Sequence, residues 1–211
     1  MGRFAEVGVG FWKEAPFLPD AIGQFRALDV TVVPVFISAG YYADEVVPRE
    51  LGLSARLSRI GGRTVRYTPP VGSHASVATI LEQRALEAGA SPADAVAVLG
   101  HGTDRNPNSG RNVYDQADRL RARADFAEVT AVFLDQEPSM ARIFERTRAA
   151  RVVVVPLFIA DGWHAGQTIP AELPSAPGVR SLVYAKAVGT HPAVADVILE
   201  LAAEAATWPE G

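Results

Sequence analysis

The sequence of 211 residues contains no cysteine. This absence excludes disulfide bonds, thiolate zinc sites and cysteine-ligated iron–sulfur clusters. Any metal that the chain binds must therefore be held by histidine, aspartate, glutamate or backbone oxygen. The sequence also lacks the GxGxxG dinucleotide fingerprint, the Walker P-loop, HExxH and GxSxG, so it gives no indication of an organic cofactor.

Long apolar runs are missing as well. The longest are strand-sized, such as Val152–Pro156, and a membrane span needs about 20 apolar residues. The first residues, MGRFAEVG, do not have the pattern of a signal peptide. The net charge is −4, whereas nucleic-acid-binding faces are basic. We therefore expect a cytoplasmic enzyme or binding protein with no membrane or nucleic-acid partner.

An internal repeat is visible in the sequence. FAEVGVGFWKEAP from Phe4 matches FAEVTAVFLDQEP from Phe126, and VTVVPVFISAGYYADEVVPREL from Val30 matches VVVVPLFIADGWHAGQTIPAEL from Val152. Both pairs have the same offset, 126 − 4 = 122 and 152 − 30 = 122. A later pair, VGSH and VGTH, has an offset of 117, which implies about five extra residues near Ser58–Arg63. Three ordered matches indicate a duplication.

The second copy begins with a unit that the first copy lacks, namely a strand at Ala95–Leu99, the segment His101-Gly-Thr103 and a helix to about Ala124. Nothing before Phe4 can supply this unit. Either the gene encodes a shortened first half, or the true start lies upstream. An incomplete first sheet would expose a strand edge, so we expect that the chain can form a homodimer.

Each copy has the pattern strand, helix, strand, loop, strand, helix. Val30–Ile37 and Val152–Ile159 are near-continuous apolar runs, typical of strands buried on both faces of a parallel sheet. Alternating strands and helices predict an α/β fold of two pseudo-symmetric lobes, each with a mainly parallel sheet flanked by helices, facing each other across a cleft. The break at Gly89–Pro92 divides them into an N-terminal lobe, 1–90, and a C-terminal lobe, 91–211.

His101 follows the first buried strand of the second copy, between Gly100 and Gly102. Ligands of open α/β sheets bind beyond the carboxyl ends of the strands, so we place His101 and Thr103 at the cleft. The two glycines leave room for a ligand near the backbone. The alternative is a structural histidine that only caps the strand.

His164 also follows a buried strand, and its counterpart in the first copy is Tyr42. A histidine that is present only in the copy that holds His101 suggests one asymmetric site; drift on a loop is the alternative. His74 and His191 occupy equivalent positions in both copies, which favours a structural role.

Polar residues near these positions are further candidates. Asp135 and Glu137 follow the strand predicted at Val129–Leu134 and can accept protons or support a metal ligand, although carboxylates before a helix also stabilise its N-terminus. Arg105 and Arg111 flank a polar loop that leads into a helix N-terminus, a position suited to anions. They are candidates for binding substrate carboxylates, and solvated surface arginines are the alternative.

These residues resemble the class II tetrapyrrole chelatases, of the sirohydrochlorin cobaltochelatase (CbiX) and ferrochelatase type. The shared marks are HGT at His101–Thr103, FLDQEPS at Phe133–Ser139, PLFxxxGxHxxxxIP at Pro156–Pro170, and VG[ST]H in both copies. The resemblance covers nearly the whole chain as a tandem duplication. It implies a chelatase-like fold in which His101 and His164 bind the metal and assist its insertion, with an acidic residue near Asp135 in support.

The chain departs from that pattern in its first half, which lacks the HG[ST] strand and has Tyr42 in place of the second histidine. Its turn FLDQEP is also shorter than usual, which leaves the choice between Asp135 and Glu137 open. The turn FWKEAP at Phe11–Pro16 resembles longer, multi-domain chelatase-like proteins, so we expect the chain to be one portion or a shortened form of such a protein.

The chemistry suits the residues. Metal insertion removes two pyrrole protons, and neutral imidazole, with an ordinary pKa of about 6.5, can act as base or ligand near pH 7. Imidazole suits cobalt, nickel and iron(II), so we expect Co²⁺, or Fe²⁺ or Ni²⁺, as a substrate. The product would enter cobalamin or siroheme biosynthesis. The carboxylates of sirohydrochlorin would pair with Arg105 and Arg111.

Two alternatives remain open. The shortened first lobe favours a non-catalytic carrier of tetrapyrrole or metal. A small-molecule module like the periplasmic binding proteins shares the lobed architecture, but that architecture does not require a histidine pair.

Overall fold

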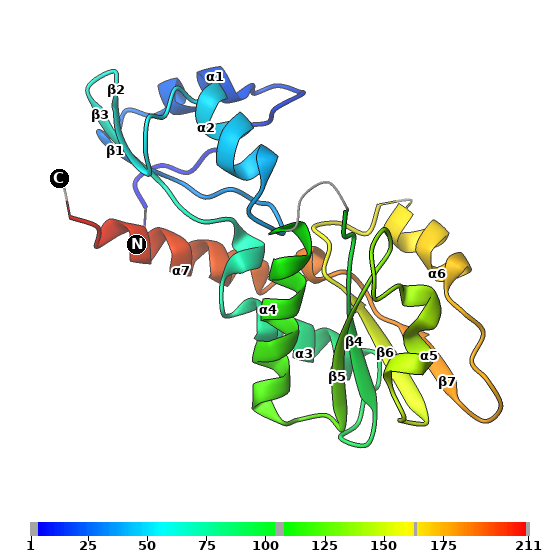
Figure 1. The fold of residues 1–211 in the computed structure, drawn as a ribbon. Helices are drawn as coiled ribbons and strands as arrows, with labels where there is room; N and C mark the ends of the chain where they lie inside the picture. The colour runs from blue at the N-terminus through cyan, green and yellow to red at the C-terminus, as the bar shows by residue number, and fades with distance from the viewer. Residues whose placement is uncertain (1–3, 104–107, 163, 210–211) are drawn as a thin grey trace.

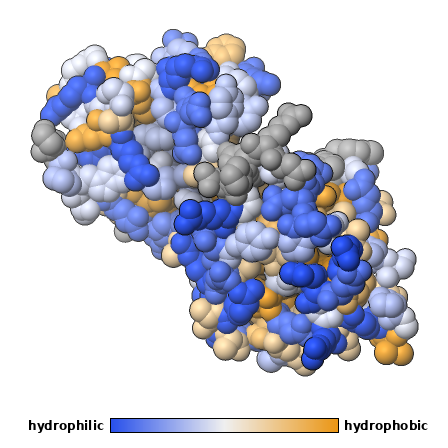
Figure 2. All heavy atoms as spheres, in the orientation of Figure 1, coloured by the Kyte–Doolittle hydropathy of each residue, from blue (hydrophilic) through white to orange (hydrophobic). Residues whose placement is uncertain are grey.

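The computed structural model describes residues 4–103, 108–162 and 164–209, without the side chains of 108, 109, 164 and 165. The chain forms two lobes, each built on its own sheet (Figure 1). Figure 2 shows hydrophobic residues scattered over the visible face of both lobes. No helix among the described residues is both long and apolar enough to cross a membrane.

The C-terminal sheet has four parallel strands in the order β5-β4-β6-β7. Their bounds are β4 (Ala95–Gly100), β5 (Glu128–Phe133), β6 (Arg151–Pro156) and β7 (Ser181–Tyr184). One face packs against α3 (Val77–Glu87) and α4 (Asn108–Arg123), and the other against α5 (Ile143–Arg146) and α6 (Ile169–Glu172). All six residues of β4 are buried, as the apolar run predicts.

The N-terminal sheet is smaller and mixed, with the order β1-β3-β2. Its strands are β1 (Asp29–Val32), β2 (Leu57–Ile60) and β3 (Arg63–Tyr67), and its short helices are α1 (Leu18–Ala21) and α2 (Val47–Glu50). β1 and β3 are parallel, but β2 and β3 form an antiparallel hairpin. The extra residues predicted from the repeat thus form β2, and the α/β class is confirmed with one antiparallel strand added.

Shorter helical turns complete the lobes. They are the 3-10 turns η1 (Ile22–Gln24), η3 (Val71–Ser73), η4 (Met140–Arg142) and η6 (Val188–Thr190), and the π-helices η2 (Tyr41–Val46) and η5 (His164–Thr168). η2 and η5 are counterparts in the repeat, as are η3 and η6.

Residues separated by 122 positions have the same roles in the two lobes. The Glu6 carboxylate accepts a hydrogen bond from the Arg26 N–H at 2.9 Å, and the Glu128 carboxylate does the same for the Arg148 N–H at 2.9 Å. However, the segment 6–10 is not a strand, although its counterpart, 128–132, belongs to β5. The predicted first strand is wrong for this segment because β5 pairs with β4, and the described residues of the first copy contain no counterpart of β4.

The lobes exchange their last helices. α3, from the first copy, lies against β6 and α4 of the C-terminal lobe, whereas α7 (Val194–Ala206), from the second copy, lies against β1 and β3 (Figure 1). The division into 1–90 and 91–211 stays a prediction from the repeat. α3, inside the first part, contributes to the core of the C-terminal sheet.

Buried polar side chains also join the lobes. Asn112 Nδ2 donates to the carbonyls of Ile37 at 2.6 Å and Gly72 at 3.0 Å, and Gln116 Nε2 donates to those of Gly72 and His74, both at 2.9 Å. Both side chains come from α4. The helix that follows the His101 loop is therefore fixed to the backbone of the N-terminal lobe.

The contacts of His74 and His191 agree with the structural interpretation. Each Nδ1 accepts a backbone N–H two residues further on, at 3.3 Å from Ser76 and 3.2 Å from Ala193. Each Nε2 lies beside a carboxylate, that of Glu204 for His74 and that of Glu87 for His191. The two histidines thus hold the starts of α3 and α7.

Candidate active site

His101 lies one residue beyond β4, where the pairing of β4 with β5 continues into the following loops. The His101 carbonyl accepts the N–H of Asp135 at 2.9 Å and that of Leu134 at 3.2 Å. These bonds fix the two loops side by side. The carboxyl ends of the parallel strands therefore bring the His101 and Asp135 side chains together.

The His101 imidazole and the Asp135 carboxylate are in contact. Nδ1 of His101 lies 3.2 Å from Oδ2 of Asp135 and 3.1 Å from the Gly102 carbonyl. A carboxylate at one ring nitrogen orients the imidazole and presents the other nitrogen, Nε2, as the ligating atom. The side chains are 60% and 62% exposed, so the pair contributes orientation more than stability.

Glu137 has different partners. Its Oε2 accepts the Ser139 N–H at 3.1 Å, and its Oε1 lies 3.9 Å from Arg142. These contacts stabilise the turn that begins η4. Of the two predicted carboxylates, Asp135 is therefore the one beside His101.

Gln136, which the sequence did not indicate, holds the loop after His101. Its Oε1 accepts the Thr103 N–H at 3.1 Å. A Cβ added at Gly110 would lie 2.6 Å from its Nε2, and one at Gly102 would lie 2.5 Å from its Cγ. The Gln136 side chain thus lies against both ends of the loop. In the sequence, the only indication of this contact is the pair of glycines, Gly102 and Gly110, on either side of the polar loop.

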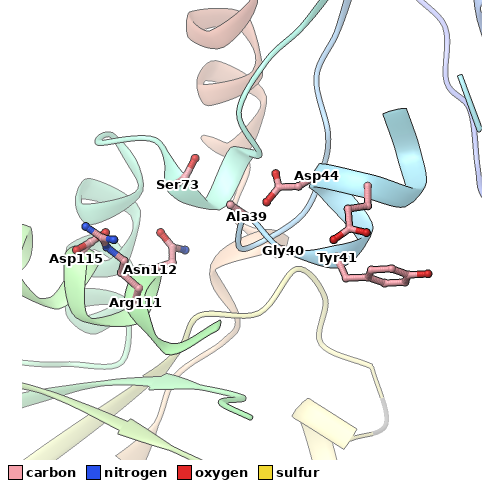
Figure 3. A pocket seen from close by; sticks show the side chains of 9 residues that line it. Ala39, Gly40, Tyr41, Asp44, Ser73, Arg111, Asn112 and Asp115 are labelled. Atoms are coloured by element: carbon pink, nitrogen blue, oxygen red, sulfur yellow. The ribbon is translucent and has the colours of Figure 1, made fainter. Parts of the chain in front are cut away.

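Arg111 lies in the first turns of α4 and lines a cavity of about 400 Å³ where the lobes meet. In Figure 3, Arg111, Asn112 and Asp115 face the cavity from α4, while Tyr41 and Asp44 belong to η2 on the other side. The predicted carboxylate-binding arginine therefore lies at the join of the two lobes.

Two predicted residues lie partly or wholly outside the described part of the chain. Arg105 is outside it entirely, and so is the side chain of His164, whose backbone begins η5. The pairing of the two predicted metal-binding histidines therefore stays a prediction.

Asp161 anchors the loop that precedes His164. Its Oδ1 accepts the Ala187 N–H at 2.8 Å, and its Oδ2 accepts the Thr190 hydroxyl at 2.8 Å. Burial raises the pKa of the nearby Tyr184 to about 12, and the Asp161 charge adds to the rise. Asp161 is not among the residues predicted from the sequence. Its counterpart in the first copy is Ala39, and this difference parallels the His164–Tyr42 difference.

Within the described residues, no group of three or more histidine, cysteine, aspartate or glutamate side chains is arranged to hold a metal ion. A full structural metal site would need about four ligands. The described part of the site instead offers His101 with Asp135 beside it.

A model of the CbiX family matches residues 1–88 and 95–205. The chain belongs to the CbiX family. A probable sirohydrochlorin cobaltochelatase of Halobacterium salinarum is 35% identical over 237 aligned residues, which cover 97% of this chain and 81% of that protein. The CbiX family thus accounts for both halves of the repeat.

Solved structures agree with this fold. A multi-domain protein from Deinococcus radiodurans with structural similarity to chelatases matches with a TM-score of 0.79 and 34% identity over 96% of this chain. The present chain spans 46% of that longer chain. SirB from Bacillus subtilis with Fe³⁺ matches with a TM-score of 0.75 and 20% identity, covering 92% of this chain and 79% of SirB, a likeness that shows the fold alone.

Proposed function

We propose that this CbiX-family protein inserts a divalent metal, cobalt or iron, into sirohydrochlorin for cobalamin or siroheme biosynthesis. The observation that carries the proposal is the His101–Asp135 pair at the carboxyl ends of β4 and β5. An oriented, exposed imidazole at the carboxyl ends of parallel strands is the group that this reaction needs, because it can bind the metal or take a pyrrole proton.

Each residue has a distinct task in this scheme. His101 and His164 hold the incoming ion through imidazole nitrogen and accept protons released by the pyrroles. Asp135 keeps the His101 ring oriented and stabilises its charged form once a proton has been taken. Glu137, with its bonds to the turn, supports the same loop from further away.

The remaining candidates bind the macrocycle. Arg111 lines the cavity between the lobes and, with Arg105, pairs with the carboxylates of sirohydrochlorin. Thr103 fixes the loop between them through its backbone. Co²⁺, Fe²⁺ or Ni²⁺ enters as substrate, and no organic cofactor is needed. A cytoplasmic location and a homodimer formed through the exposed edge of the first sheet are part of the proposal.

One observation favours a second function, a non-catalytic carrier of tetrapyrrole or metal. Among the described residues β1 has β3 as its only strand neighbour, whereas its counterpart β6 has strands on both sides. The N-terminal lobe is thus less complete than the C-terminal one. A carrier would bind sirohydrochlorin without accelerating metal insertion.

The test follows the absorbance of sirohydrochlorin mixed with Co²⁺, with and without protein. We expect acceleration by the wild type that is lost in His101→Ala and His164→Ala. Binding of metal-free sirohydrochlorin is measured separately. If the protein binds sirohydrochlorin but does not accelerate the insertion of Co²⁺, Fe²⁺ or Ni²⁺, the enzyme proposal is wrong and the carrier function takes its place. If it neither binds sirohydrochlorin nor accelerates insertion, both functions are wrong.

A further inference from the structure

Three aromatic side chains of the N-terminal lobe form an exposed cluster. Trp12, Tyr41 and Tyr42 are 41%, 54% and 48% exposed. The Trp12 and Tyr42 ring centroids are 5.1 Å apart, and those of Tyr41 and Tyr42 are 5.5 Å apart. Rings that contact one another yet remain exposed do not form part of a core. An exposed apolar patch of this kind marks a binding surface more often than chance.

The repeat relates this cluster to the candidate active site. Adding 122 to Lys13 gives Asp135, and adding 122 to Tyr42 gives His164. The aromatic cluster therefore occupies, in the N-terminal lobe, loops that correspond in the repeat to the loops with the predicted catalytic residues in the C-terminal lobe. In the first copy these loops present aromatic rings, whereas in the second copy they contain the predicted metal ligand His164 and the carboxylate Asp135.

The cluster is continuous with the cavity between the lobes. Tyr41 lines that cavity together with Arg111, and its ring extends away from α4 (Figure 3). The cavity wall on this side also contains Asp44 and Glu45, which repel carboxylates. An anionic ligand in the cleft would therefore direct its carboxylates toward other positions.

Two cations flank the rings. The Lys13 ammonium lies 4.7 Å from the centroid of a Trp12 ring. Arg49 is hydrogen-bonded to Tyr41 and Glu50, and these bonds raise the guanidinium pKa above its ordinary value. The surface thus combines exposed π faces with positive charge at its margin. A flat conjugated molecule with peripheral carboxylates matches both properties.

We propose that Trp12, Tyr41 and Tyr42 form a platform on which the tetrapyrrole ring stacks, with Lys13 and Arg49 pairing with its carboxylates. This inference rests on the proposed function and names the surface that binds its organic substrate. The N-terminal lobe holds the macrocycle, and the C-terminal lobe supplies the metal and the base.

The experiment measures equilibrium binding of metal-free sirohydrochlorin by absorbance titration of the whole chain. Trp12→Ala combined with Tyr42→Ala is expected to weaken binding about tenfold or more, since aromatic stacking and the buried ring area are both lost. Trp12→Phe keeps a ring and is expected to stay within about threefold of the wild type. Leu28→Ala, at another exposed apolar residue of the same lobe, is the matched control and should bind as the wild type does.

A kinetic measurement separates binding from chemistry. In Co²⁺ insertion the double variant should raise KM for sirohydrochlorin and leave kcat nearly unchanged, because the platform binds ground state and transition state alike. Thermal melting checks the fold, which truncation of exposed rings should preserve. If the double variant fails to melt cooperatively, the binding of sirohydrochlorin by the single variant Trp12→Gln tests the platform instead, and it should be weaker than that of the wild type.

The outcomes separate the inference from the function on which it rests. Wild-type binding that is unchanged in the aromatic variants would overturn the platform and leave the chelatase proposal standing. Absence of sirohydrochlorin binding by the wild type would overturn both. If Leu28→Ala weakens sirohydrochlorin binding as much as the double variant does, the effect is not specific to the rings. That result would also count against the platform.

Discussion

The Asp135 carboxylate lies 3.2 Å from Nδ1 of His101, and the backbone N–H of Asp135 lies 2.9 Å from the His101 carbonyl. Asp135 thus contacts His101 through both its backbone and its side chain. The orientation of the imidazole is therefore determined by the pairing of β4 with β5. A change at Asp135 should alter the chemistry at His101 without removing either strand.

Asp135→Ala is expected to lower the rate of metal insertion about 10–100-fold, the range seen when a partner that orients a metal-binding histidine is removed. Glu137→Ala is the matched control because its carboxylate contacts Ser139 and Arg142 instead. It should lose much less activity. Initial rates with Co²⁺ and sirohydrochlorin give the comparison. Equal losses in the two variants would mean that Asp135 has no special relation to His101.

Gly110→Ala should impair the site through a steric conflict, because the added Cβ would lie 2.6 Å from Nε2 of Gln136. Gln136→Ala removes that neighbour but also the acceptor of the Thr103 N–H, so the double variant should recover thermal stability, but not full activity, relative to Gly110→Ala. Alanine also favours a helix over glycine by about 1 kcal/mol, which helps the recovery at this position of α4.

Gly102→Ala is the control for that suppression. Its Cβ would also meet Gln136, but Gly102 has φ +73°, a conformation that alanine adopts only with strain. Gln136→Ala should therefore fail to rescue it. Melting curves and initial rates of the single and double variants test the scheme, and rescue of both glycine variants, or of neither, would contradict it.

Gln116→Leu should destabilise the whole chain by about 1–3 kcal/mol, since it removes two buried hydrogen bonds, those from Nε2 to the carbonyls of Gly72 and His74. Arg119→Ala is the control, because Arg119 donates to the neighbouring Ser73 carbonyl from an exposed position. It should change the free energy of unfolding by less than about 0.5 kcal/mol. Urea unfolding of both variants measures the difference.

The Glu87 carboxylate links α3 to the second copy. A hydrogen bond from Arg84 holds the pKa of Glu87 below its ordinary value of 4.5, and His191 acts in the same direction. Because the folded-state pKa is the lower one, the contribution to stability is present above pH 4.5 and is lost as the pH falls through the folded-state pKa.

Glu87→Gln should therefore be less stable than the wild type at neutral pH, and the difference should shrink as the pH falls below 4.5. Chemical denaturation at a series of pH values provides the measurement. A difference that stays constant, or grows in acid, would show that the charge of Glu87 does not stabilise the fold.

The repeat, the α/β class and the position of His101 and Asp135 after neighbouring strands follow from the sequence because each depends on local pattern and on the rule that parallel strands end at one edge. Other features depend on contacts between distant segments. The sequence left open whether Asp135 or Glu137 lies beside His101. The Thr103–Gln136 bond and the Asp161 bonds join loops whose spacing carries no motif. The segment 6–10 has the sequence of a strand and lacks, among the described residues, the partner that would make it one. The antiparallel β2 arises from an insertion, for which the second copy offers no template.

The exchange of α3 and α7 between the lobes indicates how the duplicated chain arose. Each copy of the repeat donates its last helix to the sheet of the other, which is the arrangement of a domain-swapped dimer whose two subunits have been joined end to end. A half-length ancestor would have been an obligate pair, with two identical clefts. Joining the halves released each from that symmetry, so that equivalent positions such as Tyr42 and His164 could become different.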